Sequence, residues 1–264
     1  MTRRRLDLEL VRRGLVATPG EAVDALRGGR VTVSGRPVLK PSSLVAADEP
    51  ITVTGPARPY ASRGGLKLAG ALDRFGVDPR ARRSLDAGAS TGGFTDVLLS
   101  RGAEHVVAVD VGYGQLAWRL RDDPRVTVLE RTNARSLTPS DLPFPPDVVV
   151  ADLSFISLTA AIPALAEVAA PGADFILLVK PQFEATRADV GQGGVVSDPD
   201  VWRRAVTRVT EACRDRELTP LGVVASIPRG PAGNVEFFLH ARHGAPAADL
   251  DLEAALEEGR ELAS

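Results

Sequence analysis

The chain has 264 residues, of which 44% are hydrophobic and 25% are charged, a composition typical of an ordinary globular protein with room for one large and one small domain. A single cysteine, Cys213, excludes an internal disulfide framework, and the three scattered histidines predict no metal site. The amino terminus lacks the apolar segment of a signal peptide and no apolar run reaches transmembrane length, so we expect a cytoplasmic protein without a membrane partner.

The basic residues are unevenly distributed along the chain. Residues 1–70 carry 12 basic and 6 acidic side chains, whereas residues 71–264 carry 20 and 28. The first quarter therefore either suits a polyanionic partner or presents a solvated arginine-rich surface. Only three of the 32 Lys and Arg residues are lysines, namely Lys40, Lys67 and Lys180. Arginine stays charged, but a buried lysine can lose its proton, so lysine is expected where a base is needed.

Residues 1–54 have the pattern of a small α+β unit. The apolar spacing over residues 6–15 predicts an amphipathic helix, and the capping residues Thr18–Glu21 begin a second helix that ends near Arg27. Alternation over residues 30–38, with a turn at Ser34-Gly35, predicts a β-hairpin, and residues 51–54 predict a closing strand. Residues 55–63 contain prolines and little periodicity, which predicts a linker.

Three stretches of this unit resemble the S4 RNA-binding module: Arg5–Asp7, Gly29–Gly35 and Lys40–Ser42. The resemblance covers residues 3–54 and implies that basic helix faces bind RNA backbone. A module for protein contact is the alternative. The residues implied in RNA binding, together with one at the end of the linker, are Arg3, Arg4, Arg5, Arg12, Arg13, Arg27, Arg30, Lys40 and Arg63.

Short apolar runs alternate with helical stretches over residues 64–244, which predicts a mostly parallel α/β domain. The expected helices lie at 64–75, 92–101, 115–121, 158–169 and 200–216, and the expected strands at 85–87, 105–109, 126–129, 148–151, 175–179, 218–227 and 234–242. No helix separates the last two strands, so we expect them to be antiparallel. Trp118 and Trp202 are expected to pack inside, and the acidic tail, residues 245–264, has no predicted function.

A glycine-rich turn, Asp86–Phe94, follows the first strand of this domain and opens a helix. It is neither a P-loop nor a dinucleotide fingerprint, because no Gly-Lys-Ser/Thr follows and Gly88 and Gly92 are four apart. The acid at its head, Asp86, suits a ligand with positive charge, and Asp110 at the end of the second strand is placed to bond ribose hydroxyls. A glycine turn that binds nothing is the alternative.

This turn, followed by a strand that ends in an aspartate, resembles the S-adenosylmethionine-dependent methyltransferases. The resemblance implies a Rossmann-like class I fold with a seven-stranded, mostly parallel sheet and a terminal antiparallel hairpin. It also implies S-adenosylmethionine as the cofactor and a set of residues that bind it: Asp86, Gly88, Ala89, Ser90, Thr91 and Gly92 in the turn, Asp110 at the ribose, and Asn133 and Ala134 near the adenine.

Four charged side chains are candidates for catalysis: Lys67, Asp152, Lys180 and Glu236. Asp152 and Lys180 end parallel strands at the edge of the sheet where ligands bind, and an unpaired charge beside such apolar runs would be costly. The order Lys, Asp, Lys, Glu resembles the FtsJ-type ribose 2′-O-methyltransferases. With the S4-like unit ahead of it, the chain is similar to the TlyA family, some members of which carry the name haemolysin. That similarity implies methylation of cytidine in 16S rRNA, 23S rRNA or both.

The proposed chemistry needs a base. A ribose 2′-hydroxyl is a poor nucleophile until its proton is removed, and a neutral lysine can accept that proton, an effect worth about 10²–10⁴ in rate. Lys67 and partial burial favour the neutral form of Lys180, whereas Asp152 and Glu236 oppose it. We expect Lys180→Arg to keep the fold and lose methyl transfer.

Two other functions stand as alternatives. An exocyclic-amine methyltransferase of RNA or DNA would have prolines in the motif after the fourth strand, where this chain has Asp152–Phe155. A non-enzymatic RNA-binding or haemolysin-like protein would not need the crevice of Asp86 and Asp110, and no segment is apolar enough for membrane insertion. For the methyltransferase we expect a monomer that acts on ribosomal RNA or ribosomal subunits.

Overall fold

The computed structural model describes residues 3–16, 18–27, 29–55, 59–246 and 248–264. The chain divides into two units, Met1–Ser62 and Arg63–Ser264. In the described part of the chain no helix is both long enough and apolar enough to cross a membrane. The same residues contain no cluster of three or more His, Cys, Asp or Glu side chains arranged to hold a metal ion.

The first unit packs two helices against small sheets. Helices α1 (Leu6–Arg12) and α2 (Pro19–Arg27) bury Leu6, Leu10 and Leu26 in a shared core. A three-stranded antiparallel sheet orders its strands as β3-β2-β5, with β2 at Val31–Val33, β3 at Arg36–Pro37 and β5 at Ile51–Val53. The predicted helices, hairpin and closing strand are therefore present, although α1 ends earlier than residue 15 because Gly14 has a positive φ of 66°.

The first unit also contains a sheet that the sequence did not predict. Strand β1 (Arg3–Arg5) pairs antiparallel with β4 (Leu44–Ala46). All three arginines of β1 are exposed. A run of arginines has neither the alternation nor the β-branched composition from which strands are predicted, so only the pairing partner reveals this one.

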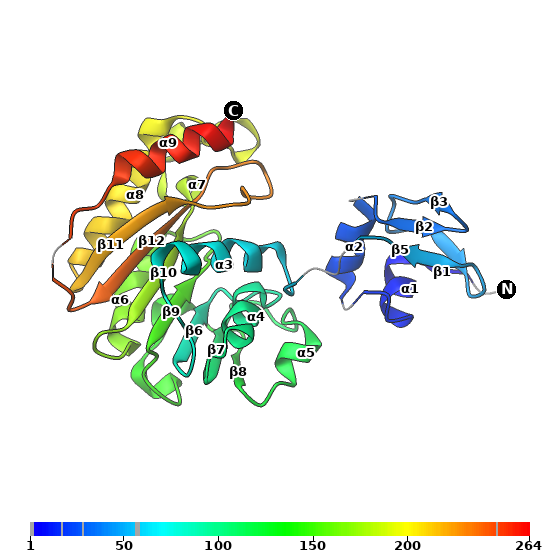
Figure 1. Cartoon of the computed structure of the whole chain (residues 1–264), viewed down its shortest axis with the longest axis horizontal. Helices are drawn as coiled ribbons and strands as arrows, with labels where there is room; N and C mark the ends of the chain where they lie inside the picture. The colour runs from blue at the N-terminus through cyan, green and yellow to red at the C-terminus, as the bar shows by residue number, and fades with distance from the viewer. Residues whose placement is uncertain (1–2, 17, 28, 56–58, 247) are drawn as a thin grey trace. The chain divides into compact units, whose positions relative to one another are not determined.

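The second unit is built on a seven-stranded sheet with the order β11-β12-β10-β9-β6-β7-β8 (Figure 1). Strand β12 is antiparallel to both of its neighbours, and the remaining neighbouring pairs are parallel. Every residue of β9 and β10 is buried, as expected for central strands covered on both faces. The strands are β6 (Arg83–Ala87), β7 (His105–Val109), β8 (Val126–Leu129), β9 (Val148–Ala151), β10 (Asp174–Val179), β11 (Leu218–Ala225) and β12 (Phe237–His243).

Helices cover both faces of this sheet. On one face, α3 (Arg63–Phe75) packs against α4 (Gly93–Ser100), and Phe94 of α4 lies 6.0 Å from the ring of Phe238. On the other face lie α6 (Leu158–Val168), α8 (Pro199–Arg214) and α9 (Leu252–Ala263), whose apolar sides join one core. Shorter pieces are α5 (Trp118–Arg121), α7 (Pro181–Glu184) and 3₁₀ turns at Ala134–Ser136, Pro139–Asp141, Arg187–Asp189 and Gln192–Gly194.

Two expectations for the helices were wrong. The stretch 115–121 is helical only over α5, because Gln115 and Leu116 line a pocket instead and Ala117 donates its N–H to the carbonyl of Thr91. Trp202 is buried as expected, but Trp118 is 74% exposed. Helical spacing alone cannot distinguish these two tryptophans, since the side that faces the core depends on which elements pack there.

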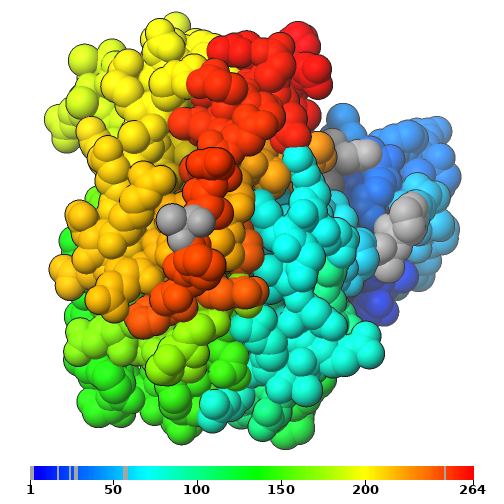
Figure 2. Space-filling view, turned by 60° about the vertical axis from the view of Figure 1, so that its left-hand side comes forward, coloured from blue at the N-terminus to red at the C-terminus, as the bar shows by residue number. Residues whose placement is uncertain are grey.

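The acidic tail forms the packed helix α9. Figure 2 shows this red segment lying over the orange strands and beside the yellow α8. Gly259 lets the helix approach closely, because an added Cβ would lie 3.1 Å from Phe237 and 3.2 Å from Val235. Glu236 lies between these two residues in the sequence and directly precedes β12, so the tail packs against the segment that carries it.

Candidate active site

The glycine-rich turn runs against the end of strand β9. Gly88 has a φ of 87°, and a Cβ on it would lie 2.5 Å from the carbonyl oxygen of Asp152. Gly92 has a φ of 95°, and its Cβ would collide with Leu120 and Leu116. Both positions combine a left-handed backbone with no space for a side chain, so only glycine fits. The turn is thereby pressed against Asp152, a candidate for catalysis.

Asp86, at the head of this turn, is fully buried. Its Oδ2 accepts hydrogen bonds from Thr95 N at 2.8 Å and from Thr95 Oγ1 at 2.6 Å. Its Oδ1 has no partner among the residues that the structure describes. Burial raises the pKa of Asp86 to about 7; the Thr95 bonds oppose this rise, and the charges of Asp152 and Asp110 add to it. A buried acceptor without a partner fits a cationic ligand.

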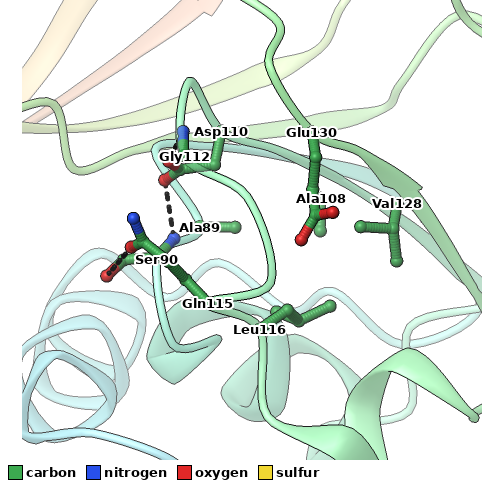
Figure 3. A pocket seen from close by; sticks show the side chains of 9 residues that line it. All are labelled: Ala89, Ser90, Ala108, Asp110, Gly112, Gln115, Leu116, Val128 and Glu130. Carbon is green, nitrogen blue, oxygen red and sulfur yellow. Dashed lines mark hydrogen bonds between the residues drawn. The ribbon is translucent and has the colours of Figure 1, made fainter.

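A pocket lies beside the turn at the carboxyl end of β7 (Figure 3). Asp110 closes one side of it: Oδ2 accepts the N–H of Ser90 at 2.8 Å, and Oδ1 accepts the N–H of Gly112 at 2.6 Å. The lining residues are Ala89, Ser90, Ala108, Asp110, Gly112, Gln115, Leu116, Val128 and Glu130. Three predicted cofactor residues, Ala89, Ser90 and Asp110, therefore line one cavity.

The other predicted cofactor residues do not line this pocket. Asp86, Gly88, Thr91 and Gly92 form the rest of the turn and its approach. Asn133 accepts the N–H of Arg135 at 3.1 Å and caps a 3₁₀ turn, while Ala134 is buried. Their loop is joined to the pocket through Thr132, whose N–H donates to the carbonyl of Asp110 at 3.0 Å.

Six of the nine lining residues were not predicted, and two of these, Gln115 and Glu130, have polar side chains. Glu130 Oε1 accepts the N–H of Gly114 at 2.7 Å and also pairs with Arg121. Glu130 directly follows strand β8, and the carboxyl ends of parallel strands are where ligands bind, so its position was a usable signal. Gln115 carries no such signal, because its approach depends on how the loop after β7 folds back.

The four catalytic candidates form two ion pairs. Lys67 on α3 meets Glu236, which directly precedes β12, with Nζ 2.5 Å from Oε2. Lys180 follows β10 and meets Asp152, which follows β9, with Nζ 2.6 Å from Oδ1. Lys180 also donates to Ser154 Oγ at 2.9 Å. None of the hydrogen bonds and ion pairs found among the described residues joins one pair directly to the other.

Phe155 is a third feature that sequence reasoning missed. Its side chain is 89% exposed, and its backbone has a φ of 68°, which is unusual for a bulky residue. Its ring lies 5.5 Å from that of Phe183, which in turn lies 5.7 Å from the ammonium of Lys180. Its exposure and its left-handed backbone make Phe155 a candidate for ligand contact at this edge of the sheet.

The arginines of the first unit differ in their availability. Arg13 is held internally: it donates to Glu9 and to the carbonyls of Ala46, Ala47 and Glu49 at 2.8–3.1 Å. Arg12 is exposed and forms a bidentate ion pair with Glu9. These two arginines lower the pKa of the Glu9 carboxyl to about 2.

The remaining predicted RNA contacts lie mostly at the surface. The exposed ones are Arg3, Arg4, Arg5, Lys40 and Arg63. Arg5 also pairs with Asp7, with Nη2 2.7 Å from Oδ2. Arg30 is half-buried, and the side chain of Arg27 lies outside the described residues.

The strand order, the glycine turn and the pocket define a class I methyltransferase. Residues 60–243 match the model of the FtsJ-like methyltransferase family, and residues 4–51 match the S4 domain. These matches establish the predicted fold class, enzyme class and cofactor, S-adenosylmethionine. The glycine cradle, the Asp110 carboxylate and the free Asp86 oxygen suit that cofactor.

Comparison with individual proteins shows to which family of methyltransferases the chain belongs. The chain is 53% identical over 241 residues, 91% of its length and 90% of theirs, to the 16S/23S rRNA (cytidine-2′-O)-methyltransferase TlyA of Mycobacterium tuberculosis strain H37Rv. It is 35% identical to Hemolysin A of Brachyspira hyodysenteriae, over 89% of this chain and 98% of that one. A solved Streptococcus thermophilus structure named as a hemolysin is 36% identical, with a TM-score of 0.77 over 100% of this chain and 96% of that one. The chain belongs to the TlyA family.

Proposed function

We propose that this protein transfers a methyl group from S-adenosylmethionine to the ribose 2′-hydroxyl of cytidine in 16S rRNA, 23S rRNA or both. The name of the Mycobacterium tuberculosis relative states this activity for that protein. The observation that carries the proposal is the pairing of Lys180 with Asp152 directly beside the cofactor turn, where Gly88 abuts the Asp152 carbonyl. A base is thereby held next to the site at which the methyl donor would bind.

The proposed chemistry assigns a separate task to each pair. The bound cofactor supplies a methyl group on a sulfonium. Lys180 in its neutral form accepts the proton of the 2′-hydroxyl, and Asp152 and Ser154 orient its amine. Lys67 and Glu236 hold α3 to the start of β12 and keep a fixed charge pair near the reacting groups. Asp86, Asp110 and the turn residues would hold the cofactor.

The proposed RNA-binding surface lies on the first unit. Its exposed Arg3, Arg4, Arg5, Arg12 and Lys40 suit contacts to phosphates, which position the RNA without reading its sequence. We retain Arg13, Arg27, Arg30 and Arg63 as weaker candidates. In this scheme residues 1–54 bind RNA, 55–63 link the domains, 64–244 carry out the chemistry, and 245–264 brace the sheet.

A ribosomal substrate supports a cytoplasmic location, which is part of the proposal. We also propose that the protein acts as a monomer. Light scattering on the purified protein, alone and with RNA, would test this state directly.

Mapping of the product tests the proposed reaction. Ribosomal RNA from cells with and without the protein, and RNA treated with purified protein and cofactor, would be cleaved with alkali and mapped. A 2′-O-methyl group blocks alkaline cleavage at that nucleotide. We therefore expect a gap in the cleavage ladder at a cytidine, and only when the protein is present. Methylation without a gap would indicate an exocyclic amine as the acceptor. RNA binding without any transfer would indicate a binding protein.

A further inference from the structure

Glu184 is a buried acid next to the candidate base that the proposed reaction does not use. It ends the short helix α7, which begins immediately after Lys180, and it is only 3% exposed. Its Oε1 accepts the N–H of Leu158 at 2.7 Å, and its Oε2 accepts the hydroxyl of Ser157. These two donors belong to a different segment, at the start of helix α6.

The pKa of Glu184 is raised above its ordinary value, although the donors around the carboxyl offset part of the effect of burial. Burial raises the pKa of Glu184, while the bonds from Ser157 and Leu158 and the charge of Arg208 oppose the rise. Free N–H groups at the start of a helix also stabilise negative charge. Arg208 of α8 additionally donates to the backbone carbonyl of Glu184 at 2.7 Å, which fixes the end of α7.

Glu184 is not needed merely to cap α6. Ser157 already accepts the N–H of Thr159 at 3.1 Å and serves as the N-cap. What Glu184 adds is a connection between two loops, residues 152–157 and residues 180–184. Both loops carry groups of the site, and they meet again where the Lys180 ammonium contacts Asp152 and Ser154.

We propose that Glu184 is a positioning residue that ties the loop after β9 to the loop after β10 and so fixes the Lys180 ammonium against Asp152 and Ser154. The two loops form a closed ring, with the Lys180 contacts at one end and the Glu184 contacts at the other. Opening the Glu184 end lets Lys180 move away from its partners. The kinetic part of this inference rests on the proposed function, in which Lys180 is the base.

The scarcity of lysine makes the position of Lys180 measurable. The three lysines are Lys40, which is exposed, and Lys67 and Lys180, which are buried. The intact protein would be labelled briefly with an amine-acylating reagent, and each lysine would be quantified by mass spectrometry. In the wild type we expect fast labelling of Lys40 and slow labelling of the other two.

In Glu184→Ala we expect Lys180 to react at least about tenfold faster, because local opening exposes its amine, while Lys67 stays at its wild-type rate. Glu184→Gln retains an acceptor oxygen and should lie between the wild type and the alanine variant. If Glu184→Ala does not fold, Glu184→Gln alone tests the proposal. Glu167→Gln alters an exposed acid on α6, the helix whose start Glu184 contacts; it is the control and should label like the wild type.

Kinetics give a second readout. We expect kcat of Glu184→Ala to fall by on the order of 100-fold, the size expected for a small misplacement of a reacting group, with the KM for RNA and the Kd for S-adenosylmethionine nearly unchanged. Lys180 labelling at the wild-type rate in both Glu184 variants would overturn the proposal, as would equal acceleration of Lys67 and Lys180, which indicates general loosening. If the wild-type protein methylates no ribose, the proposed function fails, but the labelling still decides the role of Glu184.

Discussion

The two lysine–carboxylate pairs of the site contain similar groups but differ in their access to solvent. In the Lys67–Glu236 pair the side chains are 8% and 1% exposed, whereas in the Lys180–Asp152 pair they are 10% and 26% exposed. Gly230 also packs closely against the first pair, since an added Cβ would lie 2.5 Å from Glu236 Oε1. The second pair opens toward the exposed Ser154 and Phe155.

We infer from this difference in exposure that the Lys67–Glu236 pair supports the structure and that the Lys180–Asp152 pair takes part in the chemistry. The two lysines are almost equally buried, with side chains 8% and 10% exposed, so the difference lies in their acids, Glu236 and Asp152. The closed pair is costly to break, because either partner alone would be a buried uncompensated charge. An open pair can reach a substrate hydroxyl and still be held in place by its neighbours. We therefore propose that Lys180 is the base and that Lys67 has a supporting role.

Breaking each pair in turn should give unequal losses of stability. Glu236→Ala leaves Lys67 buried without its partner and should lower the free energy of unfolding by about 3–5 kcal/mol. Asp152→Ala should cost less, about 1–3 kcal/mol, because Asp152 is partly hydrated and Lys180 retains Ser154. Urea unfolding of the cofactor-free protein measures both values. An Asp152→Ala loss as large as that of Glu236→Ala would contradict the distinction between open and closed pairs.

Another buried carboxylate, Asp174, lies at the amino end of β10, opposite the edge that carries Lys180, and extends the comparison. It bonds Arg82, His240 and Arg242, each at 2.8 Å, and these contacts hold its pKa far below the ordinary value despite burial. A lowered pKa stabilises the fold above the unfolded value near 3.8, and this contribution disappears as the pH falls toward the lower folded value.

Asp174→Asn should therefore destabilise the protein by about 3 kcal/mol at pH 7, and by less as the pH falls below about 4. Unfolding curves of both proteins across this range would measure the difference. If the difference in the free energy of unfolding between the two proteins stayed constant from pH 7 to pH 3, the charge of Asp174 would not contribute to stability.

We also expect the exposed surface beside the Lys180–Asp152 pair to bind a nucleobase of the RNA substrate. Phe155→Ala removes the exposed ring, and stacking of a base on an aromatic side chain is worth about 1–3 kcal/mol. We expect a several-fold rise in the KM for RNA with cofactor affinity unchanged. Ile227→Ala, at another exposed apolar side chain of the same domain, is the control. An unchanged KM in Phe155→Ala would remove this residue from the substrate surface.

A further expected effect concerns Asp86, whose folded pKa is raised to about 7. A raised carboxyl pKa destabilises the cofactor-free fold increasingly as the pH rises from about 4 to about 7, so Asp86→Asn should be the more stable protein at pH 8. Ionised Asp86 favours a cationic ligand. The affinity of the wild type for S-adenosylmethionine should therefore rise about tenfold from pH 6 to pH 8, and that of Asp86→Asn should stay flat. Calorimetry at several pH values measures this, with S-adenosylhomocysteine, which lacks the sulfonium charge, as the control ligand.

Much of the fold could be predicted from the sequence because its signals are local. The apolar runs of β9 and β10 are bounded by charged or turn residues, and the rule that ligands bind at the carboxyl ends of parallel strands placed Asp152 and Lys180 at one edge. The glycine turn was equally clear, since Gly88 and Gly92 need left-handed backbone.

What could not be predicted depends on contacts between distant residues. Lys67 and Glu236 are 169 positions apart, and nothing in the sequence states that they pair with each other rather than with Lys180 or Asp152. The carbonyls that hold Arg13 and the exposure of Trp118 are likewise set by tertiary packing. These features decide which pair is more exposed, so the sequence could name Lys180 as the expected base but could not show how open its ion pair is.

The most direct test of this ranking compares Lys180→Arg with Lys67→Arg in single-turnover methyl transfer to ribosomal RNA at saturating cofactor. Arginine keeps each positive charge and each ion pair but does not act as a base at neutral pH. We predict that Lys180→Arg loses about 10²–10⁴ in rate and that Lys67→Arg keeps substantially more of its activity. Wild-type turnover by Lys180→Arg, or a greater loss in Lys67→Arg, would contradict the assignment of the base to the open pair.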